Sequence, residues 1–155
     1  MTKLITTLCV VHQDEKILLG MKKRGFGALR WNGFGGKVEK DETIEEAAAR
    51  ETREEVGIEA LELEKLGVID FKFQTNGEEI EVNIFNIKNF SGTPIETEEM
   101  RPQWFDVDKI PFETMWPDDI FWIPLFLAGK KFKGKFVFGE KDAILEQKME
   151  EVQDV

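Results

Sequence analysis

The chain has 155 residues, 41% of them hydrophobic, and its 31 acidic against 21 basic side chains leave a net charge of −10. This length and hydrophobic content predict one folded domain over residues 1–155 rather than a disordered chain. The acidity argues against non-specific binding to a nucleic-acid polymer or an anionic membrane, because both would be repelled. No apolar run approaches the roughly 18 residues of a membrane span.

Three residue types that occur only once, cysteine, histidine and serine, further restrict the possible catalytic chemistry. Cys9 is the one cysteine and lies in an apolar run, so we expect it to pack in a core and no internal disulfide to form. A chain of this kind, with no recognisable signal peptide at its start, is expected in the cytoplasm. His12 and Ser91 are the only residues of their types, which disfavours a serine–histidine nucleophile.

The first part of the chain predicts two strands, a loop and a helix. Residues 3–11 and 16–21 are aliphatic and β-branched runs typical of strands. Residues 25–36 contain five glycines, which favours a loop. Residues 42–56 are rich in Glu, Ala and Arg and predict the clearest helix, with Gly57 where helices commonly end.

The second part predicts mainly strands. These are expected at 61–73, 78–88, 104–107 and 135–138. Residues 117–127 predict a helix that Pro124 interrupts, and residues 143–152 fit either a helix or a strand paired with the preceding one. Four lysines between residues 130 and 135 are expected on a solvated strand edge, where lysine prevents further pairing. The predicted fold class is α+β.

Charge is concentrated around the predicted helix. Residues 16–37 contain six basic side chains and no acidic one, whereas residues 39–55 contain eight acidic and three basic ones. At ~100° per residue, Glu51, Glu54 and Glu55 lie within one arc of about 100°. Their mutual repulsion would be relieved by a divalent cation, which prefers carboxylate oxygens. The alternative is an ordinary solvated helix with a local arginine partner.

The spacing of particular residues distinguishes these alternatives. From residue 36 to residue 58 the sequence fits G-x5-E-x7-R-E-U-x-E-E-x-G-U, where U is a bulky aliphatic residue. The matching positions are Gly36, Glu42, Arg50, Glu51, Glu54, Glu55, Gly57 and Ile58, and Thr52 is a departure from the pattern. On this box the chain resembles the Nudix hydrolases. The resemblance implies a Nudix-type α/β/α sandwich with a mixed β-sheet and one catalytic loop–helix.

The same resemblance implies a metal-dependent hydrolase of nucleoside diphosphates linked to another group. The implied ligands of Mg²⁺, or of Mn²⁺ in its place, are the carbonyl group of Gly36 and the side chains of Glu51, Glu54, Glu55 and the outlying Glu99. The implied catalytic set is Arg50, Glu51, Glu54 and Glu55, with Arg50 orienting a glutamate and Glu42 tying the loop to the helix. Metal-activated water would attack a phosphorus, with a carboxylate as general base.

Flanking stretches at 21–38, 92–105 and 110–119 resemble the family members that hydrolyse oxidised purine nucleoside triphosphates, and this likeness covers essentially the whole chain. It implies release of pyrophosphate and a monophosphate from 8-oxo-dGTP or 2-oxo-dATP. The implied substrate-binding residues are Thr7, Lys22, Phe26, Asn32, Phe71, Met100, Trp116, Asp118 and Asp119. Trp116 would stack on the base and Lys22 would approach the phosphates, whereas Arg30 and Trp31 are expected only to shape the loop.

The adjacent Asp118 and Asp119 have two interpretations. Acidic residues in the first turn of a helix are commonly caps and partners of the helix dipole. Beside several aromatic residues, however, two carboxylates are costly to bury in charged form, so one would hold a proton. We hypothesise that such a pair both donates to and accepts from the edge of 8-oxoguanine and, with its proton shifted, of 2-oxoadenine.

Two other functions remain open on the sequence. One is Nudix chemistry on a different substrate, such as a dinucleoside polyphosphate, ADP-ribose or an unmodified triphosphate. The other is a non-catalytic nucleotide- or RNA-binding module on the same fold, which the complete set of acidic residues in the box disfavours. In the leading interpretation the partner is a small nucleotide, neither a nucleic-acid polymer nor a membrane is bound, and the protein is a monomer.

Overall fold

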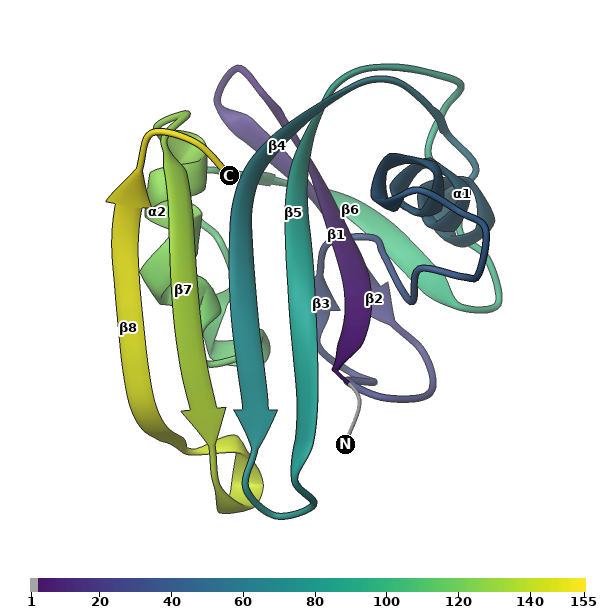
Figure 1. Cartoon of the computed structure of the whole chain (residues 1–155). Coiled ribbons are helices and arrows are strands. Elements are labelled where there is room, and N and C mark those ends of the chain that lie inside the picture. Colours follow the sequence, from purple (N-terminus) through teal and green to yellow (C-terminus); the bar gives the residue numbers. More distant parts are fainter. Residues whose placement is uncertain (1–2) are drawn as a thin grey trace.

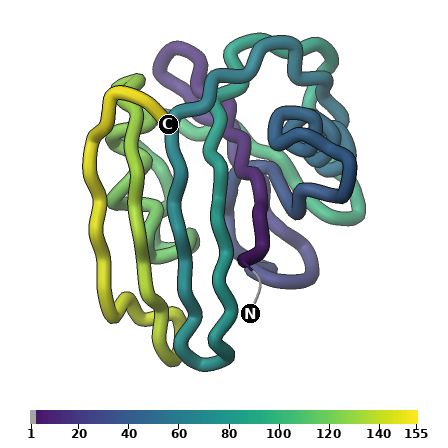
Figure 2. Tube along the Cα trace, viewed as in Figure 1, coloured from purple at the N-terminus to yellow at the C-terminus, as the bar shows by residue number. Residues whose placement is uncertain are grey.

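The computed structural model describes residues 3–155 (Figure 1 and Figure 2). Its strands are β1 (Leu4–Gln13), β2 (Lys16–Lys22), β3 (Trp31–Asn32), β4 (Glu59–Phe73), β5 (Glu78–Ser91), β6 (Met100–Asp106), β7 (Lys131–Phe138) and β8 (Ile144–Val152). Its helices are α1 (Ile44–Val56) and α2 (Asp119–Leu127), and two 3₁₀ turns are η1 (Phe112–Thr114) and η2 (Glu140–Asp142). Residues 1 and 2 lie outside the described residues. They belong both to the predicted domain and to the N-terminal segment that predicts no signal peptide.

The strands form one mixed sheet in the order β3-β2-β1-β5-β4-β7-β8, and β6 pairs with β2. The pairs β1/β5 and β4/β7 are parallel, and the remaining pairs are antiparallel. The expected mixed sheet is therefore confirmed.

The two helices cover opposite faces of this sheet (Figure 1). Cys9 and Val11 of β1 pack in a cluster that contains Ala48 of α1. Val10, which lies between them, packs in a second cluster that contains Trp122 of α2. Because successive side chains of a strand point to opposite faces, the sheet has one helical layer on each side. This is the expected α/β/α sandwich, and Cys9 is fully buried as predicted.

The glycine-rich loop lies along the edge of β1 that β5 leaves free. The amide of Cys9 donates to the carbonyl of Phe34 at 2.6 Å, and the amide of Thr7 donates to the carbonyl of Gly36 at 2.9 Å. Gly35 lies so close to the carbonyl oxygen of Thr7 that a Cβ atom at this position would overlap it. The glycines therefore permit a close backbone approach, which holds Gly36 beside α1.

Local signals fix the ends of α1. Thr43 and Glu46 form a reciprocal capping box at its start, and Gly57 ends it in the left-handed conformation with φ of 74°. The helix begins at Ile44, two residues after the predicted start, because Thr43 serves as the N-cap. The capping box and the terminal glycine satisfy backbone groups that would otherwise lack partners at both ends.

Several elements differ from the sequence-based prediction. Residues 143–152, left open between helix and strand, contain β8, which pairs with β7. The lysine-rich β7 lies between β4 and β8, so the prediction of a strand edge there was wrong. Pro124 lies within α2, and the glycine-rich loop contains the short β3. Within residues 3–155, neither helix is long and apolar enough to cross a membrane.

Candidate active site

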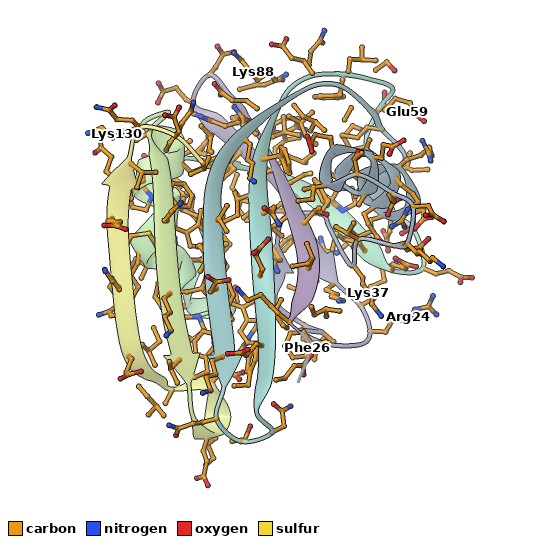
Figure 3. The ribbon with its side chains drawn as sticks, in the orientation of Figure 1. Arg24, Phe26, Lys37, Glu59, Lys88 and Lys130 are labelled. Carbon is orange, nitrogen blue, oxygen red and sulfur yellow. The ribbon has the colours of Figure 1, made fainter. Side chains whose placement is uncertain are left out.

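A cavity of about 530 Å³ lies between the sheet and α2 and reaches the glycine-rich loop. Its lining includes every residue predicted to bind substrate: Thr7, Lys22, Phe26, Asn32, Phe71, Met100, Trp116, Asp118 and Asp119. Phe26 and Lys37 both line it and lie near the same end of β1 (Figure 3). The volume is in the range typical of small-molecule sites.

The two aspartates at one end of this cavity are buried and share one partner. Asp118 is 4% exposed and Asp119 is 2% exposed. The indole Nε1 of Trp122 donates to Asp118 Oδ2 at 3.1 Å and to Asp119 Oδ1 at 3.0 Å. Asp118 is the N-cap residue of α2, yet its side chain makes no cap hydrogen bond. The capping interpretation of Asp118 is therefore wrong.

One oxygen of this pair has no partner. Among the described residues, Asp119 Oδ2 is the buried side-chain atom that makes no hydrogen bond. A buried polar atom without a partner is costly, and this one belongs to a residue that lines the cavity. A ligand with a complementary polar edge would satisfy it.

The electrostatics of the pair favour one shared proton. Burial raises the pKa of Asp118 to about 6. Burial, together with the neighbouring charge of Asp118, raises the pKa of Asp119 well above its ordinary value. Both shifts favour retention of one proton by the pair, so that one carboxyl group can donate a hydrogen bond while the other accepts.

Aromatic side chains form much of the wall at this end. The ring of Phe26 stacks against Trp116 with centroids 5.1 Å apart. Phe73 and Phe138 also contact Trp116 and line the cavity, although neither was predicted from the sequence. Strand periodicity offered a signal for Phe73, because it lies two positions after Phe71 and therefore on the same face. Phe138 offered no such signal.

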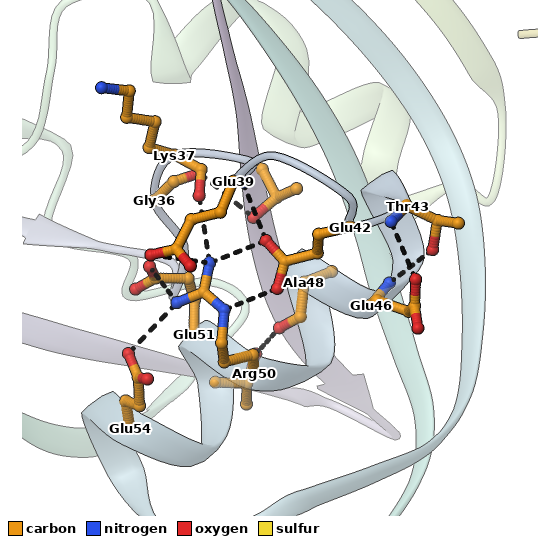
Figure 4. Close-up of polar contacts among 12 residues, drawn as sticks. Gly36, Lys37, Glu39, Glu42, Thr43, Glu46, Ala48, Arg50, Glu51 and Glu54 are labelled. Carbon is orange, nitrogen blue, oxygen red and sulfur yellow. Dashed lines mark hydrogen bonds and ion pairs between the residues drawn. The ribbon is translucent and has the colours of Figure 1, made fainter.

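On α1, Arg50 joins the acidic residues of the box (Figure 4). Its Nε and Nη2 donate to the two carboxylate oxygens of Glu42 at 2.6 and 2.9 Å. Its Nη1 donates to Glu51 at 2.9 Å and to Glu54 at 3.3 Å. The guanidinium group lowers the pKa of Glu42 to about 2. Because Glu42 follows the loop and Arg50 lies on α1, this pair connects the two segments.

Glu55 extends from α1 into the cavity. It is 5% exposed, and its Oε1 accepts a hydrogen bond from the amide of Gly35 at 2.7 Å. Burial raises its pKa to about 8, against the effect of this hydrogen bond, and the charges of Glu51 and Glu99 act in the same direction as burial. Burial likewise raises the pKa of Glu51, and the charges of Glu54 and Glu99 raise it further. Glu51 therefore lies within range of the charges of Glu54 and Glu99, and Glu55 within range of those of Glu51 and Glu99.

The donor chemistry of this cluster fits a hard divalent cation. Glu51 lies against the backbone of Gly36, where an added Cβ atom would be 2.7 Å from the Glu51 Cδ. Carboxylate and carbonyl oxygens are the ligands that such cations prefer. In the described arrangement no three acidic, histidine or cysteine side chains converge on one point, because Glu51 and Glu54 turn toward Arg50. Gly36 and Glu55 line the cavity, whereas Arg50, Glu51, Glu54 and Glu99 lie outside its lining.

Two adjacent glycine substitutions should have different effects. Gly35→Ala should lower the melting temperature, since the new methyl group meets the backbone of Thr7 at a cost of about 1–3 kcal/mol. Gly36→Ala meets the carboxylate of Glu51, which is the end of a side chain and not backbone, so the fold should persist while the Mg²⁺ concentration for half-maximal activity rises. Thermal unfolding and metal titration measure the two effects. Equal loss of stability in both variants would contradict this assignment.

Comparison with known proteins identifies the family. The NUDIX domain matches residues 2–126. This chain belongs to the Nudix family. It is 54% identical over 154 residues to the oxidized purine nucleoside triphosphate hydrolase of Danio rerio, covering 99% of each chain. It is 53% identical over 151 residues to the enzyme of the same name from Mus musculus, covering 97% of each.

A solved structure agrees with this assignment. The mutator MutT protein of Bacillus halodurans superimposes with a TM-score of 0.82 and 25% sequence identity, and the match covers 95% of this chain and 97% of that one. Nudix hydrolases generally use divalent metals such as Mg²⁺. The resemblance to Nudix hydrolases expected from the box is confirmed by these matches.

Proposed function

We propose that this Nudix hydrolase converts oxidised purine nucleoside triphosphates, such as 8-oxo-dGTP and 2-oxo-dATP, into the nucleoside monophosphate and pyrophosphate with Mg²⁺. The names of the vertebrate relatives, which align over almost the whole chain, support this substrate class. We further propose that the protein acts as a monomer in the cytoplasm, a compartment that suits a chain whose one cysteine is buried and unpaired.

The observation that carries the proposal is the continuity of the cavity. One space is lined both by Asp118 and Asp119 at the start of α2 and by Gly36 of the glycine-rich loop and Glu55 of α1. A nucleotide has a hydrogen-bonding base at one end and phosphates at the other, so it matches this division. The unpartnered Asp119 Oδ2 favours a ligand whose base presents a polar edge.

The residues at the base end have complementary roles in this proposal. Ionised Asp118 accepts from an N–H group of the base, and protonated Asp119 donates to a carbonyl oxygen. Trp116 provides an aromatic face for stacking, and Asn32, whose Oδ1 accepts from the amide of Gly33 at 2.9 Å, can offer its amide nitrogen to the ligand. A shift of the shared proton from one aspartate to the other would exchange the hydrogen-bond donor and the acceptor. The exchanged arrangement would suit the base of 2-oxo-dATP.

At the phosphate end, Glu51, Glu54, Glu55, Glu99 and the carbonyl of Gly36 would hold the divalent metal. When bound, the metal supplies neutralisation of charge on the phosphoryl oxygens and lowers the pKa of the attacking water. Arg50 holds Glu51 and Glu54 in orientation and is itself fixed by Glu42. Lys22 lines the same cavity, and its positive charge suits a phosphate oxygen.

A product assay tests this function directly. The purified protein mixed with 8-oxo-dGTP and Mg²⁺ should release pyrophosphate and 8-oxo-dGMP in equal amounts, and excess EDTA should stop the reaction. Unmodified dGTP, a dinucleoside polyphosphate and ADP-ribose serve as comparison substrates. Faster turnover of one of these would support the alternative Nudix substrate, and binding of 8-oxo-dGTP without any product would support the non-catalytic module.

A further inference from the structure

Arg30 contacts Trp116, which lines the cavity, although Arg30 itself is neither a lining residue nor among the residues assigned above. Its guanidinium carbon lies 4.1 Å from the centroid of the Trp116 ring, well inside the distance for a cation–π contact. The side chain of Arg30 is 28% exposed, so the contact is partly shielded from water. Arg30 thus touches the residue that we propose as the stacking surface for the base.

A carboxylate from a distant part of the chain holds Arg30. Its Nη2 lies 3.1 Å from Oδ2 of Asp142, whose side chain is 33% exposed. Asp142 belongs to the turn η2 between β7 and β8, beyond residue 126 where the match to the NUDIX domain ends. The ion pair therefore links the glycine-rich loop to a hairpin outside the matched family region.

The backbone of this turn has an unusual conformation. Lys141 and Asp142 have φ values of 55° and 58°, in the left-handed region that non-glycine residues rarely adopt. Such conformations persist only where the surrounding structure holds them, and they cluster at functional sites. Asp142, in this conformation, carries the carboxylate that pairs with Arg30.

The same loop offers a comparison. Arg24 pairs with Glu98 at 4.0 Å, with side chains 64% and 90% exposed, and ion pairs of that kind contribute little. Arg24 makes no cation–π contact among the described residues. Arg30 differs in having a shorter ion pair, less exposure and an aromatic face beneath it.

The charge of Arg30 also acts on the aspartate pair. Burial raises the pKa of both Asp118 and Asp119, and the positive charge of Arg30 opposes that increase. Arg30 thus lies near enough to influence both the stacking surface and the groups that contact the base edge.

We propose that Arg30, anchored by Asp142, is a positioning residue that fixes the ring of Trp116 for stacking on the purine base. This inference rests on the proposed function for its substrate, and on the distance between Arg30 and the Trp116 ring for the contact itself. Through Asp142, the hairpin β7–β8 contributes to the substrate specificity of this enzyme. Asp142 acts only through Arg30, because Asp142 does not line the cavity.

Kinetics separate positioning from a structural role. Arg30→Gln should raise the KM for 8-oxo-dGTP about five-fold with kcat nearly unchanged, since the lost contact supports binding of the base rather than the chemical step. Asp142→Asn should raise it about three-fold, and asparagine tolerates the left-handed conformation. Because Asp142 acts through Arg30, the double variant should be no worse than Arg30→Gln alone. Arg24→Gln is the matched control and should behave as wild type.

A second measurement needs no substrate. With 5-fluorotryptophan incorporated, the ¹⁹F resonance of Trp116 is identified as the one missing in Trp116→Phe. Arg30→Gln and Asp142→Asn should both shift this resonance, whereas Arg24→Gln should not. If the wild type fails to hydrolyse 8-oxo-dGTP, the proposed function fails while this measurement still tests the contact.

The results that overturn the inference are equally specific. A Trp116 resonance that stays in place in Asp142→Asn shows that the carboxylate does not position the ring. Additive KM effects in the double variant show that Asp142 does not act through Arg30. A fall in melting temperature in both variants with an unshifted Trp116 resonance assigns the pair to stability alone.

Discussion

Replacement of Glu55 by glutamine is expected to lower kcat by about 10³-fold while the protein stays folded. Glu55 is the carboxylate of the box that lines the cavity, and we propose it as a metal ligand. Glutamine has nearly the same shape and keeps an oxygen to accept the hydrogen bond from Gly35. The substitution therefore removes the carboxylate charge that a bound cation would stabilise, and little else.

The stability of the same variant separates function from folding. Burial raises the pKa of Glu55 to about 8, so without metal at neutral pH its side chain is largely a neutral acid that glutamine resembles, and Glu55→Gln should have a melting temperature in EDTA close to that of the wild type. Glu45, an exposed glutamate in the first turn of α1, provides the control, and Glu45→Gln should keep wild-type kcat. Retained Mg²⁺-dependent turnover in Glu55→Gln would contradict the proposed metal site.

Much of the fold follows from local patterns in the sequence. The capping threonine and the terminal glycine limit α1 to nearly the predicted residues, and the alternation of 61–73 and 78–88 predicts two long strands. Thr52, the departure from the box, is fully buried and its hydroxyl donates to the carbonyl of Ala48 at 2.8 Å. Its polar group is therefore satisfied within the helix, and the helix tolerates the change.

The C-terminal part could not be predicted in the same way. The composition of 143–152 favours a helix locally, but the segment forms β8 by pairing with β7 from Lys131 to Phe138. Pairing with a neighbouring strand overrides weak local propensity. The wrong prediction for the lysines of β7 has the same origin, because a strand is an edge only if nothing pairs beyond it.

The candidate site likewise has one part that local sequence patterns predict and one part that they do not. Spacing along a single helix predicted the cluster of glutamates, because residues three and four apart share a face. The ion pair of Arg30 with Asp142 joins positions 112 residues apart (142 − 30), and no periodicity relates them. The contact of Phe138 with Trp116 likewise depends on the register of β7 beside β4. Such contacts follow from tertiary structure alone.

Asp118→Asn is expected to lower kcat/KM for 8-oxo-dGTP by about 10³-fold, and Asp119→Asn by less than about ten-fold. The difference follows from the proposed roles, in which Asp118 accepts from the base as a carboxylate, a role that an amide nitrogen cannot fill. Asp119 donates in this proposal, and an amide can donate in its place. Asp108→Asn changes an exposed carboxylate and should behave as wild type.

The pH profile supports the same assignment. Burial raises the pKa of Asp118 to about 6, so the ionised form is lost as the pH falls through about 6, and kcat/KM should fall with it. The folded protein also binds more protons than the unfolded chain between the ordinary value of 3.8 and about 6, so the stability that this group contributes is lost as the pH rises across that window. In Asp119→Asn, kcat/KM should still fall at low pH, because Asp118 is unchanged. Any fall of kcat/KM at high pH that is due to deprotonation of Asp119 should be absent.

The second oxidised purine tests whether the shared proton can shift. Recognition of 2-oxo-dATP is proposed to require transfer of the proton between the two aspartates, which an asparagine at position 119 prevents. Asp119→Asn should therefore lose far more kcat/KM for 2-oxo-dATP than for 8-oxo-dGTP, whereas a fixed pattern of donors and acceptors predicts equal losses. Full kcat/KM on both nucleotides in Asp118→Asn and in Asp119→Asn would show that the pair does not read the base, and the unpartnered Asp119 Oδ2 would then need another ligand group.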